Sequence, residues 1–184
     1  GKLLPDGLDT DWDDPNQRDL LSDVSIHAPV ERGDGDKTVI LVDLGCKRSI
    51  EEGLTSRGLR VVRVPWDYPF DTTPADGVCL SSGPGDPRRY VQVIDRVKSE
   101  LANDRPVLGI CLGHQLMGLA AGGEVYKLPF GHRGQNQPCI EVGTGRSIVT
   151  SQNHGYALSV ETVDSGWSPW FTNGNDGSCE GIAH

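Results

Sequence analysis

Short runs of apolar residues alternate with helix-like stretches over residues 38–121. The runs have the length and apolar character of buried strands, and they lie at 38–43, 60–64, 77–81 and 106–110. Helices are predicted at 47–56, beyond residue 87 and at 116–121; the second has one apolar face, formed by Tyr90, Ile94, Val97 and Leu101. Buried strands that alternate with helices are typical of a parallel sheet covered on both faces. We therefore expect an α/β fold with a doubly wound, mostly parallel sheet.

The pattern changes after Gly123, where the apolar positions form short β-like segments separated by glycine-bearing turns. These segments are predicted at 124–128, 137–142, 147–151 and 170–172. Their spacing leaves no room for crossover helices, which parallel strands need. We therefore expect antiparallel pairing in this part of the chain.

Composition adds a boundary near residue 36. The chain has 184 residues and a net charge of −9, and residues 1–36 hold ten acidic against three basic side chains. This Pro-, Gly- and Asp-rich stretch is predicted to be an acidic linker, with one globular domain over 37–184. The remaining charge is small, so the sequence gives no support for a nucleic-acid partner.

Cysteine usage indicates a reducing compartment. The five cysteines have no paired spacing and no Cys-x-x-Cys motif, which argues against a disulfide framework or a zinc site. There is no signal peptide-like segment and no apolar run of membrane-spanning length. We expect a soluble cytoplasmic protein without a membrane partner.

The segment Gly109-Ile-Cys111-Leu-Gly113-His-Gln115 closes the fourth predicted strand and opens a helix. Small residues two before and two after a nucleophile are what a sharp strand-to-helix elbow requires. A thiol at a helix N-terminus faces unpaired N–H groups that favour the thiolate. Cys111 is therefore predicted to be an accessible, activated nucleophile; the alternative is an inert buried cysteine.

Two further segments are candidates for the same pocket. Gly83-Pro84-Gly85 follows the third predicted strand, and if that strand adjoins the fourth, an N–H from this turn and that of Leu112 can bind an oxyanion. Residues 152–156 offer amide, imidazole and phenol groups suited to an amino-acid ligand, or form only a turn. His154 has no partner at metal-ligand spacing, so no metal site is expected. The polar loop at 131–137 remains unassigned by these arguments.

These motifs together resemble the class I, triad-type glutamine amidotransferase domain of carbamoyl-phosphate synthetase. The elbow is similar to the class in general, whereas Ser82-Gly-Pro-Gly-Asp-Pro87, Phe130-Gly-His-Arg-Gly-Gln-Asn-Gln-Pro138 and Ser151-Gln-Asn-His-Gly-Tyr156 resemble this member. The segments at 64–68 and 170–184 look closest to fused pyrimidine-synthesis polypeptides. The resemblance implies a flavodoxin-like fold and, before residue 37, the connection from a small-subunit domain that is absent here.

Carried over by position, the resemblance makes Cys111 the nucleophile. It implies glutamine contacts at Gly83, Gly85, Leu112, Gln115, Asn153, Gly155 and Tyr156, with Gly85 and Leu112 as oxyanion donors. The family's catalytic histidine and glutamate lie in a Phe-His-Pro-Glu motif, which this chain does not reach before His184. We therefore expect a domain truncated at its C-terminus and inactive alone. His184 and His114 are not given the role of base.

The implied function is hydrolysis of glutamine to glutamate and ammonia, which a synthetase subunit or fused synthetase domain uses with ATP and Mg for pyrimidine or arginine biosynthesis. No cofactor is expected in the domain itself. One alternative is an amidotransferase-like domain that supports a synthetase without hydrolysing glutamine. Another is a different class I amidotransferase, such as an anthranilate synthase component.

Overall fold

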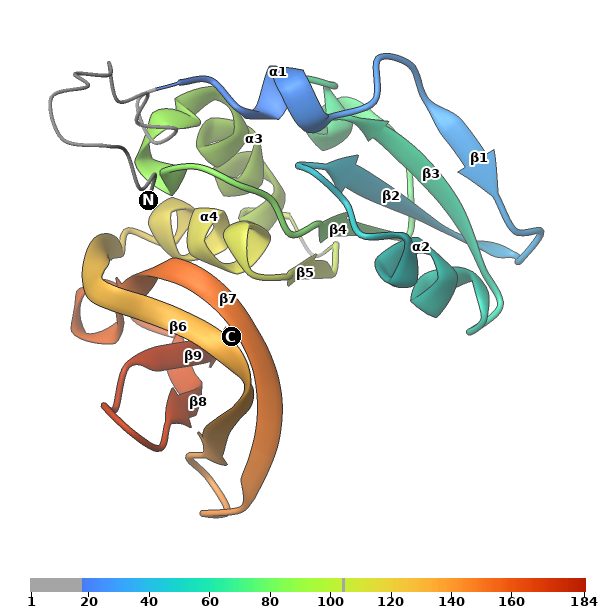
Figure 1. Ribbon diagram of the computed structural model, residues 1–184. Coiled ribbons are helices and arrows are strands. Elements are labelled where there is room, and N and C mark those ends of the chain that lie inside the picture. Colours follow the sequence, from blue (N-terminus) through green and yellow to red (C-terminus); the bar gives the residue numbers. More distant parts are fainter. Residues whose placement is uncertain (1–17, 104) are drawn as a thin grey trace, which may run out of the picture.

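The computed structural model describes residues 18–103 and 105–184, which form a five-stranded sheet with helices and a separate small barrel (Figure 1). The sheet has the order β1-β3-β2-β4-β5. Its strands are β1 (Val30–Arg32), β2 (Lys37–Asp43), β3 (Leu59–Pro65), β4 (Gly77–Leu80) and β5 (Val107–Gly109). Strands β2 to β5 pair in parallel, and β1 pairs antiparallel to β3 at the edge. The four strands expected from the apolar runs are confirmed.

Helices cover both faces of this sheet, as the alternation along β2 shows. Leu41 packs on one face with side chains of α2 (Arg48–Thr55), whereas Ile40 and Val42 pack on the other with α3 (Val91–Leu101) and α4 (Leu112–Ala120). A strand buried on both faces must be apolar throughout, which explains the continuous apolar run at 39–42. The doubly wound fold is therefore confirmed.

The described part of 1–36 packs against this domain, although the sequence placed the whole stretch in an exposed linker. Helix α1 (Leu21–Val24) buries Leu21 completely in the main core, and the Ile26 N–H donates to Asp43 Oδ2 at 2.9 Å. One leucine and a few backbone contacts suffice to dock a segment whose composition is otherwise polar. The acidic residues at 1–17 lie outside the described residues, and a linker to a further domain stays a prediction.

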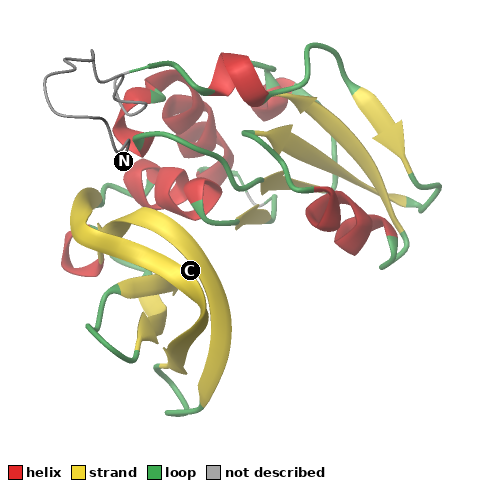
Figure 2. Ribbon diagram, in the orientation of Figure 1, coloured by secondary structure: helices red, strands yellow, loops and turns green. Residues whose placement is uncertain are grey.

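Strands β6 (Glu124–Glu141), β7 (Ser147–Ser159), β8 (Ser168–Asn173) and β9 (Cys179–Ala183) form the barrel, in the closed order β6-β7-β9-β8. All pairs are antiparallel, as expected. Figure 2 shows that this part is almost entirely strand, in contrast to the mixed layer above it. The segments predicted at 124–128 and 137–142 belong to one long strand, whose register shifts between Lys127 and His132 and again between Gly134 and Gln137.

Short 3-10 helices complete the described part of the chain, at η2 (Phe70–Thr72), η3 (Pro87–Arg89) and η4 (Val160–Thr162). None of the helices in the described ranges is long and apolar enough to cross a membrane. Helix α4 links the two parts, because its N-terminus follows β5 and its C-terminus leads into β6 (Figure 1). Cys111 lies between the end of β5 and the start of α4, and residues of the barrel line the same cavity.

Candidate active site

Cys111 occupies a sharp turn between β5 and α4. Its backbone has φ 54° and ψ −107°, and among the described residues it is the only non-glycine residue with positive φ. Such a conformation is strained for a residue with a side chain and is held by its surroundings. A Cβ on Gly109 would lie 2.6 Å from the Gly113 carbonyl oxygen, and one on Gly113 would lie 2.4 Å from the Leu80 carbonyl oxygen. The small residues that the elbow was expected to require are therefore sterically necessary.

Cys111 is partly exposed as a residue and lines a surface cavity, which excludes the alternative of a cysteine sealed in the core. Its protonation differs from the expectation. Burial raises the pKa of Cys111, whereas the Leu112 N–H and the Lys47 ammonium lower it less strongly. The expectation that the helix N-terminus activates the thiol was right in direction but too large in effect, because desolvation penalises the thiolate more.

The Gly83–Gly85 turn forms the second wall. It follows β4, which pairs directly with β5, so the condition for a pocket shared with the elbow is met. A Cβ on Gly83 would lie 1.9 Å from the Leu44 carbonyl oxygen, and Gly85 has φ +96°. Both positions therefore require glycine, and the backbone of this turn lies open to the pocket.

Strand β7 forms the third wall. Gln115 on α4 donates from Nε2 to the Tyr156 carbonyl at 2.8 Å, which fixes β7 against the helix behind Cys111. Between these walls lies a cavity of about 190 Å³. It is lined by Gly83, Pro84, Gly85, Cys111, Gln115, Lys127, Arg133, Asn153, His154, Gly155 and Tyr156.

Six of the seven expected glutamine-contacting residues line this cavity, and the nucleophile does too. The seventh, Leu112, is buried with only 1% of its surface exposed, and its backbone N–H lowers the pKa of Cys111. Pro84 and His154, from the two segments proposed for this pocket, line the cavity as well, and so do Lys127 and Arg133, which were not predicted. The unassigned loop at 131–137 carried one of them, and the ladder of β6 to β7 brings it there by pairing Arg133 with Asn153.

The cavity is electropositive. Lys127 and Arg133 line it, no carboxylate does, and within the described residues neither cation forms an ion pair. Arg133 is held by a bond from Nη1 to the Phe130 carbonyl at 2.8 Å, and the Lys127 ammonium lies 5.9 Å from the centre of the Tyr156 ring. A nucleophilic thiol beside unpaired cations suits a substrate that carries both an electrophilic carbon and a carboxylate.

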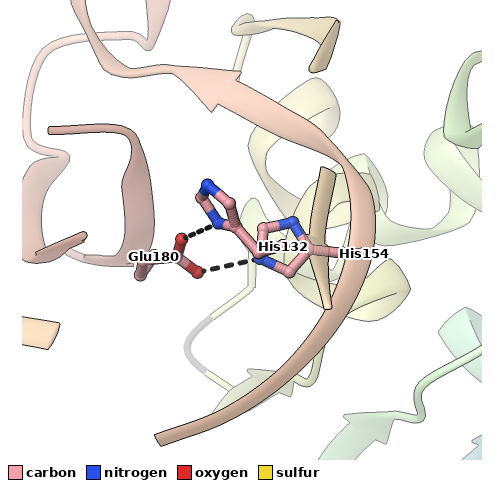
Figure 3. A group of neighbouring side chains, drawn as sticks. All are labelled: His132, His154 and Glu180. Carbon is pink, nitrogen blue, oxygen red and sulfur yellow. Dashed lines mark hydrogen bonds and ion pairs between the residues drawn. The ribbon is translucent and has the colours of Figure 1, made fainter. Parts of the chain in front are cut away.

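Three ionisable side chains from different strands meet beside the cavity: His132, His154 and Glu180 (Figure 3). Each offers an atom within 4.8 Å of the others, a spacing that a metal ion could bridge. The expectation that His154 has no such partner nearby is wrong, because its partners come from β6 and β9 and sequence spacing cannot show them. The site also contains the buried amide of Asn173, whose Nδ2 lies 3.3 Å from both His132 Nδ1 and Glu180 Oε1.

His114 lies on the other side of the elbow. Burial lowers the pKa of His114 to about 4, so its ring is neutral near pH 7, and its buried Nε2 has no partner in the described part of the chain. Beside it opens a larger cleft of about 1370 Å³, lined by the edge strand β5 through Leu108 and by the barrel through Trp170 and Ile182. Cys111 lies where the cleft and the small cavity meet.

Known structures share this fold. A putative GMP synthase subunit from Thermoplasma acidophilum superposes with a TM-score of 0.67 at 21% identity, covering 80% of this chain and 78% of that one. A glutamine amidotransferase from Thermotoga maritima superposes with a TM-score of 0.65 at 16% identity, covering 82% and 73%. At these identities the likeness establishes the fold alone.

Sequence relatives are closer. The chain is 46% identical over 190 residues to multifunctional protein CAD of Squalus acanthias, covering 100% of this chain and 8% of that protein. It is 41% identical over 176 residues to the arginine-specific small chain of carbamoyl phosphate synthase from Schizosaccharomyces pombe, covering 92% and 42%. The chain thus spans less than half the length of these relatives. The family model described as glutamine amidotransferase class-I matches residues 40–184, and the chain therefore belongs to the class I glutamine amidotransferase family.

Proposed function

We propose that this chain is the glutamine-hydrolysing part of a carbamoyl-phosphate synthase, in which it releases ammonia for a synthetase. The observation that carries the proposal is the cavity at Cys111, which combines a nucleophilic thiol with amide groups and two unpaired cations and contains no carboxylate. Glutamine matches this arrangement, because its side-chain amide is an electrophile and its α-carboxylate is an anion. Similarity to fused multifunctional proteins and to a small chain supports the same assignment.

In the proposed reaction the Cys111 thiolate attacks the side-chain carbonyl carbon of glutamine, and a tetrahedral oxyanion forms. The N–H groups of Leu112 and Gly85 are the proposed donors to this oxyanion. Collapse breaks the C–N bond, a proton passes to the leaving nitrogen, and ammonia departs from a thioester. Water then attacks the thioester carbon, the C–S bond breaks, and glutamate and the thiol are restored.

The proton transfers need a base, and the raised pKa of Cys111 makes this need acute. We propose that the base is the histidine of the family's Phe-His-Pro-Glu motif, oriented by the glutamate of that motif, in the longer protein. The cleft of about 1370 Å³ beside Cys111 has room for a further strand along the exposed edge of β5. Acid–base assistance of this kind is worth about 10²- to 10⁴-fold in rate.

A second candidate is a domain that supports a synthetase without hydrolysing glutamine. One relative, 40% identical over 187 residues, is named carbamoyl-phosphate synthase [ammonia], mitochondrial, from Aquarana catesbeiana, so identity at this level does not separate the two functions. The cavity does favour hydrolysis, because it retains the thiol, the strained elbow and Gln115 together. Another class I amidotransferase fits less well, because the relatives from Squalus acanthias, Aquarana catesbeiana and Schizosaccharomyces pombe are carbamoyl-phosphate synthases or a multifunctional protein.

The proposal includes a partner and a compartment. The ammonia would pass to a synthetase subunit or fused domain that uses ATP and Mg, serving pyrimidine or arginine biosynthesis, and the chain itself would need no cofactor. Free thiols at all five cysteines are compatible with the cytoplasm.

The test uses a glutamine analogue in which a diazomethyl ketone replaces the amide. Protonation of the diazo carbon and loss of N₂ let the Cys111 sulfur form a C–S bond, which mass spectrometry locates. We expect one label on Cys111, protection by glutamine but not by asparagine, and no label in Cys111→Ser. Cys46→Ser is the matched control, because that thiol is also partly exposed but does not line the small cavity.

Turnover is tested in the intact synthetase. There Cys111→Ser should abolish carbamoyl-phosphate synthesis from glutamine while synthesis from added ammonia continues. Labelling spread over several cysteines, or glutamine-dependent synthesis that survives Cys111→Ser, would contradict the proposed function.

A further inference from the structure

We propose that Glu180 is a positioning residue that holds His154 as an imidazolium on the wall of the Cys111 cavity, where this charge helps to bind the substrate's carboxylate. The inference rests on the proposed function for the identity of the substrate. The charge of His154 is inferred from the hydrogen-bond geometry and does not depend on the proposed function.

Every group that faces the ring nitrogens of His154 is a hydrogen-bond acceptor. Nδ1 lies 2.9 Å from the Tyr156 carbonyl oxygen, and Nε2 lies 3.2 Å from Glu180 Oε2 and 3.4 Å from Gln152 Oε1. The Gln152 amide is oriented by its Nε2, which donates to Thr150 Oγ1 at 3.1 Å, so its oxygen faces the ring. A neutral imidazole would direct a lone pair at one of these acceptors. Both nitrogens must therefore carry protons.

Glu180 provides the compensating charge from a nearly buried position. Its side chain is 10% exposed and that of His154 is 12% exposed, so the pair is screened little by solvent. Burial would lower the pKa of His154, but the Glu180 carboxylate and the Tyr156 carbonyl raise it above its ordinary value. Burial would likewise raise the pKa of Glu180, and His154 instead holds it below its ordinary value. The geometry and these directions agree on a charged pair.

A second set of contacts fixes the position of Glu180. Its Oε1 lies 2.9 Å from His132 Nδ1 and accepts from Asn173 Nδ2 at 3.3 Å. His132 Nε2 in turn lies 2.9 Å from Asp176 Oδ2. Each carboxylate oxygen of Glu180 therefore faces a different histidine, one from β6 and one from β7, as Figure 3 shows. A shorter or neutral side chain at 180 could not hold both rings.

The effect reaches the cavity by two routes. His154 itself lines the cavity with Lys127 and Arg133, so its charge adds to theirs and favours an anionic group of the substrate. His154 Nδ1 also shares the Tyr156 carbonyl with Gln115 Nε2, at 2.9 and 2.8 Å. Glu180 thereby acts on substrate binding through His154 and not by contact with the reacting atoms.

A bound metal ion is the competing interpretation of the same cluster. Asn173 argues against it, because its Oδ1 accepts from the Asn175 N–H at 2.8 Å, which turns its Nδ2 toward Glu180 and His132. An N–H donor at the centre of the cluster repels a cation and satisfies the carboxylate instead. We therefore assign protons to this cluster, and a stoichiometric metal is an outcome that the test must detect.

The other titratable groups around the pair set the background for any pH dependence. Those on neighbouring elements are His132 of β6, Asp176 before β9, and Cys111 and His114 at the elbow. His114 is neutral near pH 7, since burial lowers its pKa to about 4. Burial raises the pKa of Cys111, so the thiol loses its proton only at alkaline pH. This titration affects the rate of nucleophilic attack. The affinity for the substrate's carboxylate depends instead on the charge of His154.

The direct test is the pH titration of the His154 ring nitrogens by NMR in the 184-residue chain, with the signals assigned from His154→Asn. We expect an imidazolium at pH 7 in the unaltered protein, because both ring nitrogens face hydrogen-bond acceptors. Glu180→Gln should lower the pH at which His154 loses its proton, and Glu180→Asp should restore part of the difference. Glu161→Gln is the matched control, as an exposed glutamate in η4, which follows β7.

The functional arm is the KM for glutamine in the intact synthetase. Removing one charge-assisted hydrogen bond from a binding site costs about ten- to a hundredfold in affinity, so Glu180→Gln should raise KM by about this factor with little change in kcat. The KM of the unaltered enzyme should rise as the pH passes the His154 pKa. Glu161→Gln should leave KM unchanged.

Three results would overturn the inference: a neutral His154 at pH 7, a Glu180→Gln enzyme with lowered kcat but unchanged KM, or one equivalent of tightly bound zinc in the purified protein. The NMR result does not depend on turnover. An enzyme without glutamine-dependent activity would therefore refute the proposed function, while the charge of His154 would still be decided.

Discussion

The side-chain amide of Gln115 and the main-chain carbonyl of Tyr156 are joined by a 2.8 Å hydrogen bond that crosses from helix α4 to strand β7. Both residues are 6% exposed. This bond is the direct link between the helix that follows Cys111 and the strand that supplies Asn153 and Gly155 to the cavity. The position of β7 beside the nucleophile therefore depends in part on this buried amide, in addition to the packing of Leu158 against Gly118 of α4.

Gln115→Met should test this link, because it nearly conserves volume and removes the donor. The Tyr156 carbonyl keeps the bond from His154, so we expect a loss of only about 1 kcal/mol in the free energy of unfolding. The affinity for glutamine should fall by more than the stability does, because β7 loses its hydrogen bond to Gln115 of α4. Chemical denaturation and calorimetry measure the two effects. The control is Gln135→Met, at an exposed position; equal losses in both variants would refute the link.

Gly113→Ala should distort the elbow. The new Cβ would lie 2.4 Å from the Leu80 carbonyl oxygen, and neither backbone can move without shifting β4 or α4. Overpacking of this kind costs about 1 to 3 kcal/mol, and labelling of Cys111 should slow because its strained conformation is lost. Gly143→Ala is the matched control, since a Cβ there meets no atom within 4 Å. If both variants unfold at the same denaturant concentration, the steric argument is wrong.

How much of this site the sequence predicts depends on the range of the interactions. Cys111 and its glycines form a local motif, and the motif identified them. His154 and Glu180 are far apart in sequence and meet only because β6, β7 and β9 close into a barrel, and β9 was not predicted. Strand β9 (Cys179–Ala183) pairs with β7 only through Leu158 and Cys179. It is too short to show an alternating pattern of apolar positions in the sequence.

The same distinction holds in the core. The apolar runs predict the central strands because burial on both faces needs no other information. Glu100 of α3 was not among the residues of the predicted apolar face, yet it is completely buried, which a charged residue tolerates only with a partner. The partner is Arg105, which also donates to the carbonyls of Phe70 and Thr73. A pattern of apolar positions cannot show such a pair, because it gives the polarity of each side chain but not which side chains are neighbours in the folded protein.

The pH dependence of Cys111 alkylation should report its raised pKa. With iodoacetamide, which carries no recognition group, the rate should rise by about tenfold per pH unit below the thiol pKa. Lys47→Gln removes a cation that lowers this pKa and should therefore slow labelling at fixed pH. Cys79 is the internal control, because burial raises its pKa to about 12. A Cys111 rate that is constant between neutral and alkaline pH would contradict the assignment.

Asp43 ends strand β2 and organises the loop on which the Gly83 turn rests. Its completely buried carboxylate accepts N–H bonds from Gly45 and Cys46 through Oδ1 and from Ile26 through Oδ2, at 3.0, 2.7 and 2.9 Å. Arg63 Nη2 donates to Oδ2 at 2.8 Å. Burial alone would raise the pKa of Asp43, but these donors outweigh it and hold the pKa below its ordinary value.

Asp43→Asn should destabilise the protein by about 1.5 to 3 kcal/mol at neutral pH, because the N–H donors and Arg63 lose their anionic acceptor, while Arg63 keeps Glu51 as a second partner at 3.5 Å. A lowered pKa in the folded state means that this stability is present above the pKa of the unfolded chain and is lost as the pH falls through the folded value. The difference in unfolding free energy between the unaltered protein and Asp43→Asn should therefore shrink below about pH 5. Denaturation at a series of pH values measures it. Asp76→Asn is the control, since that carboxylate also has a lowered pKa but is 39% exposed in its pair with Lys37, and its effect should be much smaller. A difference for Asp43→Asn that stays constant down to acid pH would show that Asp43 is protonated in the folded protein.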